Sequence, residues 1–182
     1  MTGVQTCALP IWGGANVDAK DEGGQTALIY AAALNPNPDV AVLLLESGAD
    51  VNVKTNEGVT ALMSAARYSS NPEVVSALLK FGAGAGTTSS RGTTALMLAA
   101  NNPEPGIVLA LLEAGADVDA RTEDGLTALM YAARNPNSEI MSALLKSGAD
   151  VNVGTNEDYT ALMAAAQYNP SKIGRASCRE RV

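Results

Sequence analysis

Residues 48–82 carry the pattern that decides the fold, and they read GADVNVKTNEGVTALMSAARYSSNPEVVSALLKFG. Thr60 is a good helix N-cap, and the residues after it, from Ala61 to Ala66, are mostly strong helix formers. Before Thr60, residues 54–58 have the composition of a hairpin tip, closed by a glycine that tolerates positive φ. One unit is therefore predicted to contain a hairpin followed by a short helix.

A second helix is predicted to begin near Asn71 and Pro72. An Asn that precedes Pro leaves the α region and can cap the next helix, and Pro suits the first position of that helix. The helix is expected to end at Gly82, because glycine favours the left-handed conformation of a C-terminal cap. Its apolar face is expected to contain Val74, Leu78 and Leu79.

This unit repeats along the chain. The tripeptide T-A-L occurs at Thr26, Thr60, Thr94, Thr127 and Thr160, in steps of 34, 34, 33 and 33 residues. We expect the two shorter steps to lose their residue from the connector between the two helices, which keeps the packed helices in register. Residues 82–86 read G-A-G-A-G where other units read G-A-D-V-N, and this junction is expected to loosen the hairpin after it.

The unit resembles the ankyrin repeat, which carries T-P-L-H-x-A before G-A-D-V-N in 33 residues. The resemblance covers nearly all of residues 12–171 and implies an all-α repeat fold, an α-solenoid of helix-turn-helix repeats joined by β-hairpin loops, with four full repeats and partial ends. The T-A-L-M and Asn-Pro variants are similar to ankyrin arrays of bacterial proteins. The chain departs from the family motif at two positions: Ala replaces the family's Pro, and an apolar residue replaces its His. Because the family's His hydrogen-bonds neighbouring loops, we expect somewhat looser loops. The apolar residues are Ile29, Met63, Met97, Met130 and Met163.

The two ends lack the repeat pattern. Residues 1–11, MTGVQTCALPI, and residues 172–182, KIGRASCRERV, resemble translations of the paired adapters of sequencing libraries. We expect both tails to be disordered and inessential to the fold, and residues 12–171 to be an internal piece of a longer gene. The alternative is that both tails are genuine flexible termini. The only cysteines, Cys7 and Cys178, lie in these tails.

Charge and composition exclude several kinds of function. The chain has a net charge of −7, and residues 172–182 hold four basic residues and one acidic residue, or +3, so residues 12–171 carry −10. Such an acidic segment disfavours nucleic acid and anionic membranes as partners. The chain has no histidine, and residues 12–171 have no cysteine, so the usual nucleophile–base pairs and zinc sites cannot be assembled. We expect no enzymatic activity, no metal and no cofactor.

The family resemblance points instead to a surface. In ankyrin-like stacks, the hairpin tips and the exposed side of the first helices form a concave face that generally binds proteins. By distance from the repeated Thr, all five tyrosines and six of the eight basic residues of 12–171 fall on this face. Tyr and Arg are frequent interface anchors. We expect a monomer that binds a protein partner through Lys54, Glu57, Arg67, Tyr68, Arg91, Arg121, Tyr131, Arg134 and Tyr159.

Two alternatives remain open at this stage. Tyr30 and Tyr131 can pack between repeats while the cations only offset nearby acidic residues. The whole stack can also be a structural spacer of a larger multi-repeat protein, with no ligand of its own.

Overall fold

The computed structural model describes residues 14–168, and both adapter-like tails lie outside the described residues. Within this part the chain forms helices and no named β-strand; the only β-pairing is two isolated bridges, Thr88 with Thr94 and Gly154 with Thr160. The predicted all-α repeat fold is confirmed. The helices are α1 (Ala27–Leu34), α2 (Pro38–Glu46), α3 (Ala61–Tyr68), α4 (Pro72–Lys80), α5 (Ala95–Ala99), α6 (Pro105–Glu113), α7 (Ala128–Arg134), α8 (Ser138–Lys146) and α9 (Ala161–Tyr168).

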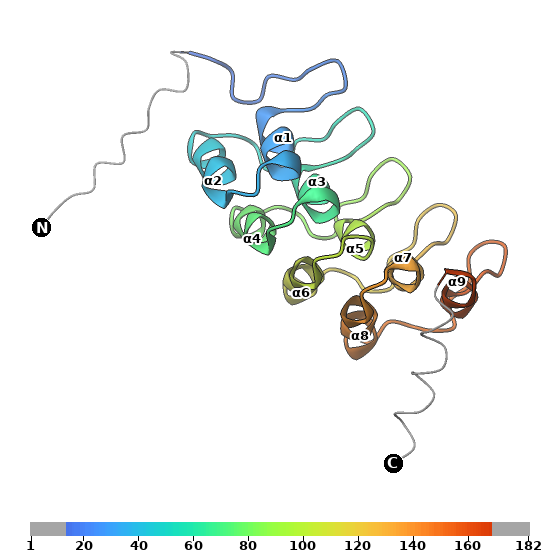
Figure 1. The fold of residues 1–182 in the computed structure, drawn as a ribbon. Helices are drawn as coiled ribbons and strands as arrows, with labels where there is room; N and C mark the ends of the chain where they lie inside the picture. Colours follow the sequence, from blue (N-terminus) through green and yellow to red (C-terminus); the bar gives the residue numbers. More distant parts are fainter. Residues whose placement is uncertain (1–13, 169–182) are drawn as a thin grey trace, which may run out of the picture.

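The helices form two layers (Figure 1). The first helices of the repeats, α1, α3, α5, α7 and α9, follow one another in one row, and the second helices, α2, α4, α6 and α8, form the other. The hairpin loops that precede the first helices all project to the same side of this row. The tips of these loops and the first helices therefore share one face of the stack.

The helices begin where the sequence predicts. The Thr60 hydroxyl accepts a hydrogen bond from the Met63 amide at 3.3 Å, and Thr26 and Thr94 cap α1 and α5 in the same way. The Asn71 side chain accepts from the Glu73 amide at 2.9 Å and leads into Pro72 at the start of α4. These caps satisfy amide groups that would otherwise lack partners at the helix ends.

The core runs between the two layers. Leu78 and Leu111, at equivalent positions of α4 and α6, are both fully buried. Leu79 was expected to share this burial, but it is only partly buried, and Val75 is the residue that completes the buried face of α4. The reason is helical geometry: Val74 and Leu78 are four residues apart and share the middle of the buried face, whereas Leu79 is turned by about 100° from Leu78 and lies at its edge.

Neighbouring hairpin tips are joined by hydrogen bonds. Each tip is closed by a turn. In the second tip, the Gly58 amide donates a hydrogen bond to the Thr55 carbonyl at 2.9 Å, and Gly58 has a φ of 77°. A Cβ on Gly58 would lie 2.9 Å from the Ser90 amide nitrogen of the next tip, so this close approach requires glycine. Ser90 in turn donates its amide hydrogen to the Glu57 carbonyl at 2.9 Å. Backbone contacts of this kind connect all five tips even though the family's His is missing.

The location of the lost residue in the shorter repeats differs from the prediction. Ser69, the C-cap of α3, stands two residues before the N-cap of α4, and Asn135, the C-cap of α7, also stands two residues before the N-cap of α8. The connectors of these two repeats are therefore equal in length, whereas α3 has 8 residues and α7 has 7. In the third repeat, α5 has only 5 residues, and its C-cap, Ala100, stands four residues before Glu104, the N-cap of α6. The prediction that the connector loses the residue is wrong, because the helix end absorbs the change.

This shortening places two asparagines in the core. The Asn102 amide nitrogen donates to the carbonyls of Ala66 and Ser69, at 3.1 and 2.9 Å, and its oxygen accepts from the Glu104 amide at 2.9 Å. Asn135 repeats the arrangement one unit later, with donation to the Asn102 carbonyl at 2.8 Å. The C-terminal ends of α3, α5 and α7 are thus linked by buried side-chain amides.

The glycine-rich junction lacks contacts that the other junctions have. Asp18 and Asp119 accept hydrogen bonds from the amides of Asp50 and Asp150 in the next repeat, and Asn52 accepts from Gly84. Gly86 stands at the same position and has no side chain to offer to the amide of Asp117. Other repeats have an aspartate at the position of Gly84. Its carboxylate accepts a hydrogen bond from the amide two residues later, as Asp117 does from Asp119, and Gly84 cannot form this bond. The predicted loosening agrees with these two missing side-chain bonds.

The last described helix lacks a neighbour on one side. Leu162 of α9 is 65% exposed, whereas the equivalent Leu129 of α7 is 3% exposed. This exposed end follows directly from the stacking, since each first helix is covered by the next. No helix in the described part of the chain is long and apolar enough to cross a membrane.

Candidate functional site

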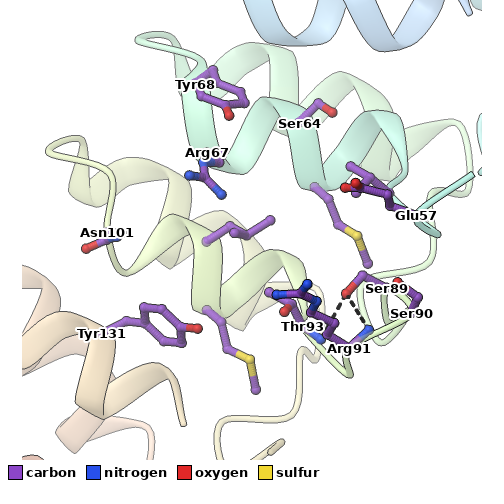
Figure 2. A pocket seen from close by; sticks show the side chains of 14 residues that line it. Glu57, Ser64, Arg67, Tyr68, Ser89, Ser90, Arg91, Thr93, Asn101 and Tyr131 are labelled. Atoms are coloured by element: carbon purple, nitrogen blue, oxygen red, sulfur yellow. Dashed lines mark hydrogen bonds between the residues drawn. The ribbon is translucent and has the colours of Figure 1, made fainter. Parts of the chain in front are cut away.

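A hollow lies on the face that the first helices share with the hairpin tips. It encloses about 620 Å³ and is formed by α3, α5, α7 and the tips of the second and third hairpins. Five of the predicted partner-binding residues line it: Glu57, Arg67, Tyr68, Arg91 and Tyr131. Figure 2 shows that Arg67, Arg91 and Tyr131 extend toward this space from three different elements.

The two arginines of the hollow are exposed, and their side chains form no hydrogen bond or ion pair with residues 14–168. Arg67, near the end of α3, has its guanidinium carbon 5.3 Å from the centre of the neighbouring Tyr68 ring, a cation–π contact. The Arg91 side chain makes no hydrogen bond or ion pair within residues 14–168. The backbone at Arg91 is held by Ser89, whose hydroxyl oxygen accepts hydrogen bonds from the amides of Arg91 and Thr93 at 3.3 and 3.1 Å (Figure 2).

The tyrosines differ from one another in burial. Tyr68 is 60% exposed, whereas Tyr131 is half-buried and packs against the core, so the alternative of packing between repeats holds in part for Tyr131. Burial raises the pKa of the Tyr131 phenol, and the opposing effects of Arg134 and Arg67 do not cancel this rise. Tyr30 is exposed and donates to the Asp21 carboxylate at 2.7 Å, which raises the pKa of Tyr30 and lowers that of Asp21.

A second, smaller hollow of about 150 Å³ adjoins the first and shares Tyr131 with it. Two further predicted residues, Arg134 and Tyr159, line this hollow. The Arg134 guanidinium carbon lies 4.5 Å from the centre of the Tyr168 ring, and the Tyr159 hydroxyl donates to Gln167 at 2.9 Å. Seven of the nine predicted residues thus line two neighbouring hollows on one face.

The remaining two predicted residues, Lys54 and Arg121, lie outside the hollows on the hairpin rim. The Lys54 amine donates to the Thr88 carbonyl of the next repeat at 3.3 Å, and the Arg121 guanidinium donates to the Gly154 carbonyl at 2.7 Å. Lys20 makes the same contact with the Lys54 carbonyl at 3.0 Å. These cations join adjacent repeats, a role that the sequence did not indicate, and their part in partner binding stays a prediction.

Sequence reasoning missed several residues that line the central hollow, among them Ser64, Leu98, Ser90 and Asn101. Ser64 and Leu98 could have been found, because they stand four residues after the repeated Thr, as Tyr131 does. Neither side chain is a Tyr or an Arg, the residue types that mark a frequent interface anchor in a sequence. Ser90 lies on the same hairpin tip as Arg91 and is exposed.

The site offers binding groups and little catalytic chemistry. Its polar side-chain groups are two guanidinium groups, hydroxyls, the Asn101 amide and one carboxylate, in a hollow that is open to solvent. Among the described residues, no group of three or more His, Cys, Asp or Glu side chains is placed to hold a metal ion.

Comparison with known proteins places the repeat pattern in a family. The ankyrin repeats (3 copies) family model matches residues 5–89, 30–122 and 96–176, which together cover most of the chain. A search of curated proteins finds no match to the chain.

Proposed function

Because the chain belongs to the ankyrin repeat family, whose members are generally protein–protein interaction modules, we propose that it binds a partner protein through its concave face. The concave face is the surface formed by the hairpin tips and the exposed sides of α1, α3, α5, α7 and α9. The observation that carries the proposal is the central hollow, where the side chains of Arg67, Arg91 and Tyr68 are exposed and form no hydrogen bond or ion pair with another repeat within residues 14–168. Ankyrin repeat proteins are typically non-enzymatic, so binding alone is the proposed activity.

The location of these residues supports binding over a spacer role. A spacer needs its contacts between repeats, and in this stack Lys54 and Arg121 supply such contacts. The side chains of Arg67 and Arg91 form no hydrogen bond or ion pair that joins repeats within the described chain. Long charged side chains without structural contacts, placed around a hollow, have the properties of interface anchors.

Residue variation between repeats also favours the concave face. The buried positions keep Leu and Met in successive first helices, as at Leu62, Leu96 and Leu129. The position four residues after the repeated Thr changes from Tyr30 to Ser64, and then to Leu98 and Tyr131. Positions that differ in size and polarity give each repeat its own contact, which specific recognition of one partner requires.

The test uses the full chain to isolate binding proteins and then compares two variants. Arg67→Ala should weaken binding by at least about 1 kcal/mol if Arg67 is an anchor, and the rim cations should affect mainly the association rate and its salt dependence. Lys80→Ala is the matched control, because Lys80 is exposed on α4, in the other layer of helices.

The site of contact needs its own measurement. Photo-crosslinking residues placed at Tyr68 and Asn101 should capture the partner, whereas one placed at Ser76 of α4 should not. Equal loss of affinity in Arg67→Ala and Lys80→Ala, or crosslinks confined to the second helices, would exclude the concave face as the binding surface.

A further inference from the structure

Side chains on the hairpins join neighbouring repeats in two series, and both series are interrupted at the same place. In the first series, a side-chain oxygen accepts a hydrogen bond from a backbone amide of the next repeat. The pairs are Asp18 with Asp50, Asn52 with Gly84 and Asp119 with Asp150, at 3.1, 3.1 and 2.9 Å. In the third repeat this position is Gly86, which has no side chain to offer to the next repeat.

The second series consists of long cationic side chains that donate to backbone carbonyls of the next repeat. The pairs are Lys20 with the Lys54 carbonyl, Lys54 with the Thr88 carbonyl and Arg121 with the Gly154 carbonyl, at 3.0, 3.3 and 2.7 Å. The third repeat has Thr88 at this position, and a threonine side chain is too short to reach across. Both series therefore miss the joint between the third and fourth repeats.

The hairpin side of this joint is left with a single backbone contact between the tips. The Glu123 amide donates to the Arg91 carbonyl at 3.1 Å. The preceding joint has the equivalent bond, from the Ser90 amide to the Glu57 carbonyl at 2.9 Å, in addition to members of both series. Within residues 14–168, no side-chain hydrogen bond connects the third hairpin with the fourth, whereas such bonds cross every other joint.

The opposite edge of the same joint is firmly held. The buried Asn135 side chain donates to the carbonyls of Ala100 and Asn102 in the third repeat, at 3.0 and 2.8 Å. Asn137 adds a bond to the Pro103 carbonyl at 3.3 Å. These contacts lie where the first helices end, whereas the hairpins lead into the starts of the first helices. The joint is thus fixed at one edge and weakly connected at the other.

We propose that the stack is hinged at this joint, so that α1 to α6 and α7 to α9 move as two units about a pivot at Asn135. Opening on the hairpin side breaks only the bond between Glu123 and Arg91, whereas opening of any other joint also breaks side-chain bonds. The core limits the amplitude, because a wide opening would expose Leu96, which is fully buried on α5. Gly86 adds backbone freedom beside the joint.

The hinge is a property of the free chain and goes beyond the proposed binding function. It divides the concave face into a part with three hairpin tips and a part with two. A partner that contacts both parts favours one angle between them, so that binding and the hinge are coupled.

Amide hydrogen exchange of the full chain, followed by NMR, measures the opening directly. Each missing side-chain bond shifts an opening equilibrium by about two- to tenfold, so the Glu123 amide should have a protection factor at least about tenfold lower than that of Ser90. The Gly125 amide is the internal control, because it donates to Thr122 within the fourth tip and does not cross the joint. Equal protection of Glu123 and Ser90 would overturn the hinge, and equally low protection of Glu123 and Gly125 would show local fraying of the tip instead.

The substitution Gly86→Asp should close the hinge by supplying the missing carboxylate. Asp119 shows the expected contact one repeat later, and a Cβ at Gly86 meets no atom within 4 Å, so the side chain fits. The variant should raise the protection of Glu123 by about tenfold and leave that of Gly125 unchanged. Gly86→Ala is the matched control, because it restricts the same backbone without an acceptor; an equal rise in this control would refute the role of the missing bond.

A second substitution, Thr88→Lys, tests the other series independently of the glycine. Lys54 occupies the same position one repeat earlier, so the new amine should reach the Arg121 carbonyl and also raise the protection of Glu123. Unchanged protection of Glu123 in both Gly86→Asp and Thr88→Lys would overturn the hinge. These measurements contain no partner, so their outcome is independent of whether the concave face binds a protein.

Discussion

Asn102 joins three segments of the stack, and its replacement by Ala tests how much the buried amides contribute to stability. The side chain is 3% exposed and makes three hydrogen bonds to backbone groups, two of them to carbonyls in the preceding repeat. Ala removes all three bonds and leaves the carbonyls of Ala66 and Ser69 and the amide of Glu104 without these partners.

The expected cost follows from these three bonds. One hydrogen bond between neutral groups contributes about 0.5–1.5 kcal/mol net, so three contribute roughly 1.5–4.5 kcal/mol. Buried groups that stay unpaired shift the cost toward the upper part of this range. We expect Asn102→Ala to lower the free energy of unfolding by about 2–4 kcal/mol. A loss of 3 kcal/mol lowers the thermal midpoint by roughly 6–12 °C in a domain of this size.

The measurement is urea unfolding of the full chain followed by far-ultraviolet circular dichroism. Asn101→Ala is the matched control, because Asn101 is adjacent, exposed and makes no side-chain hydrogen bond within the described residues. The control should differ from the parent protein by no more than about 0.5 kcal/mol. Equal stabilities of the two variants would refute the argument that the buried amides hold the ends of the first helices together.

Three further predictions concern the core, the tails and the alkaline range. Leu78→Ala and Leu111→Ala should each cost about 2–5 kcal/mol in denaturant melts. Leu109→Ala, at a side chain 49% exposed, should cost clearly less, and a similar cost would contradict the packing of the second helices. Deleting residues 1–11 and 172–182 should leave the thermal midpoint within a few degrees, and loss of cooperative unfolding would show that the tails matter. Because the folded-state pKa of Tyr131 is raised, the unfolded state loses its proton first, and stability should fall as the pH rises above about 10. Tyr131→Phe should flatten that fall in urea melts at increasing pH, and identical slopes would exclude Tyr131 as a contributor.

Local features were predictable because they depend on a few neighbouring residues. The Thr60 and Asn71 caps and the positive φ of Gly58 were each expected from short stretches of sequence. The fold class followed from the repetition of these local features. The turn of the fifth tip has Asp158 at the glycine position, with a φ of 59°, which shows that the turn geometry persists without glycine.

Contacts between repeats were harder to predict. The roles of Asn102 and Asn135 depend on where the shorter repeats lose a residue, and the sequence alone allows that gap in the helix or in the connector. For the same reason the sequence did not show that Lys54 and Arg121 reach the backbone of the next repeat. Seven of the nine candidate residues line the two adjoining hollows. They could be predicted because residues at the same sequence distance from the repeated Thr lie on the same face of every repeat.

The glycine-rich junction has a mechanical consequence. A stack of repeats bends like a jointed rod, and its stiffness at each joint depends on how many contacts cross it. Since Gly86 makes no side-chain contact with the Asp117 segment, we expect the hairpin side of the joint after the third repeat to bend more easily than that of the other joints. Arg91 lies on the hairpin that follows this glycine run, and Tyr131 lies on the far side of the joint. Bending there changes the distance between these two side chains, so the curvature of the rod sets the width of the hollow.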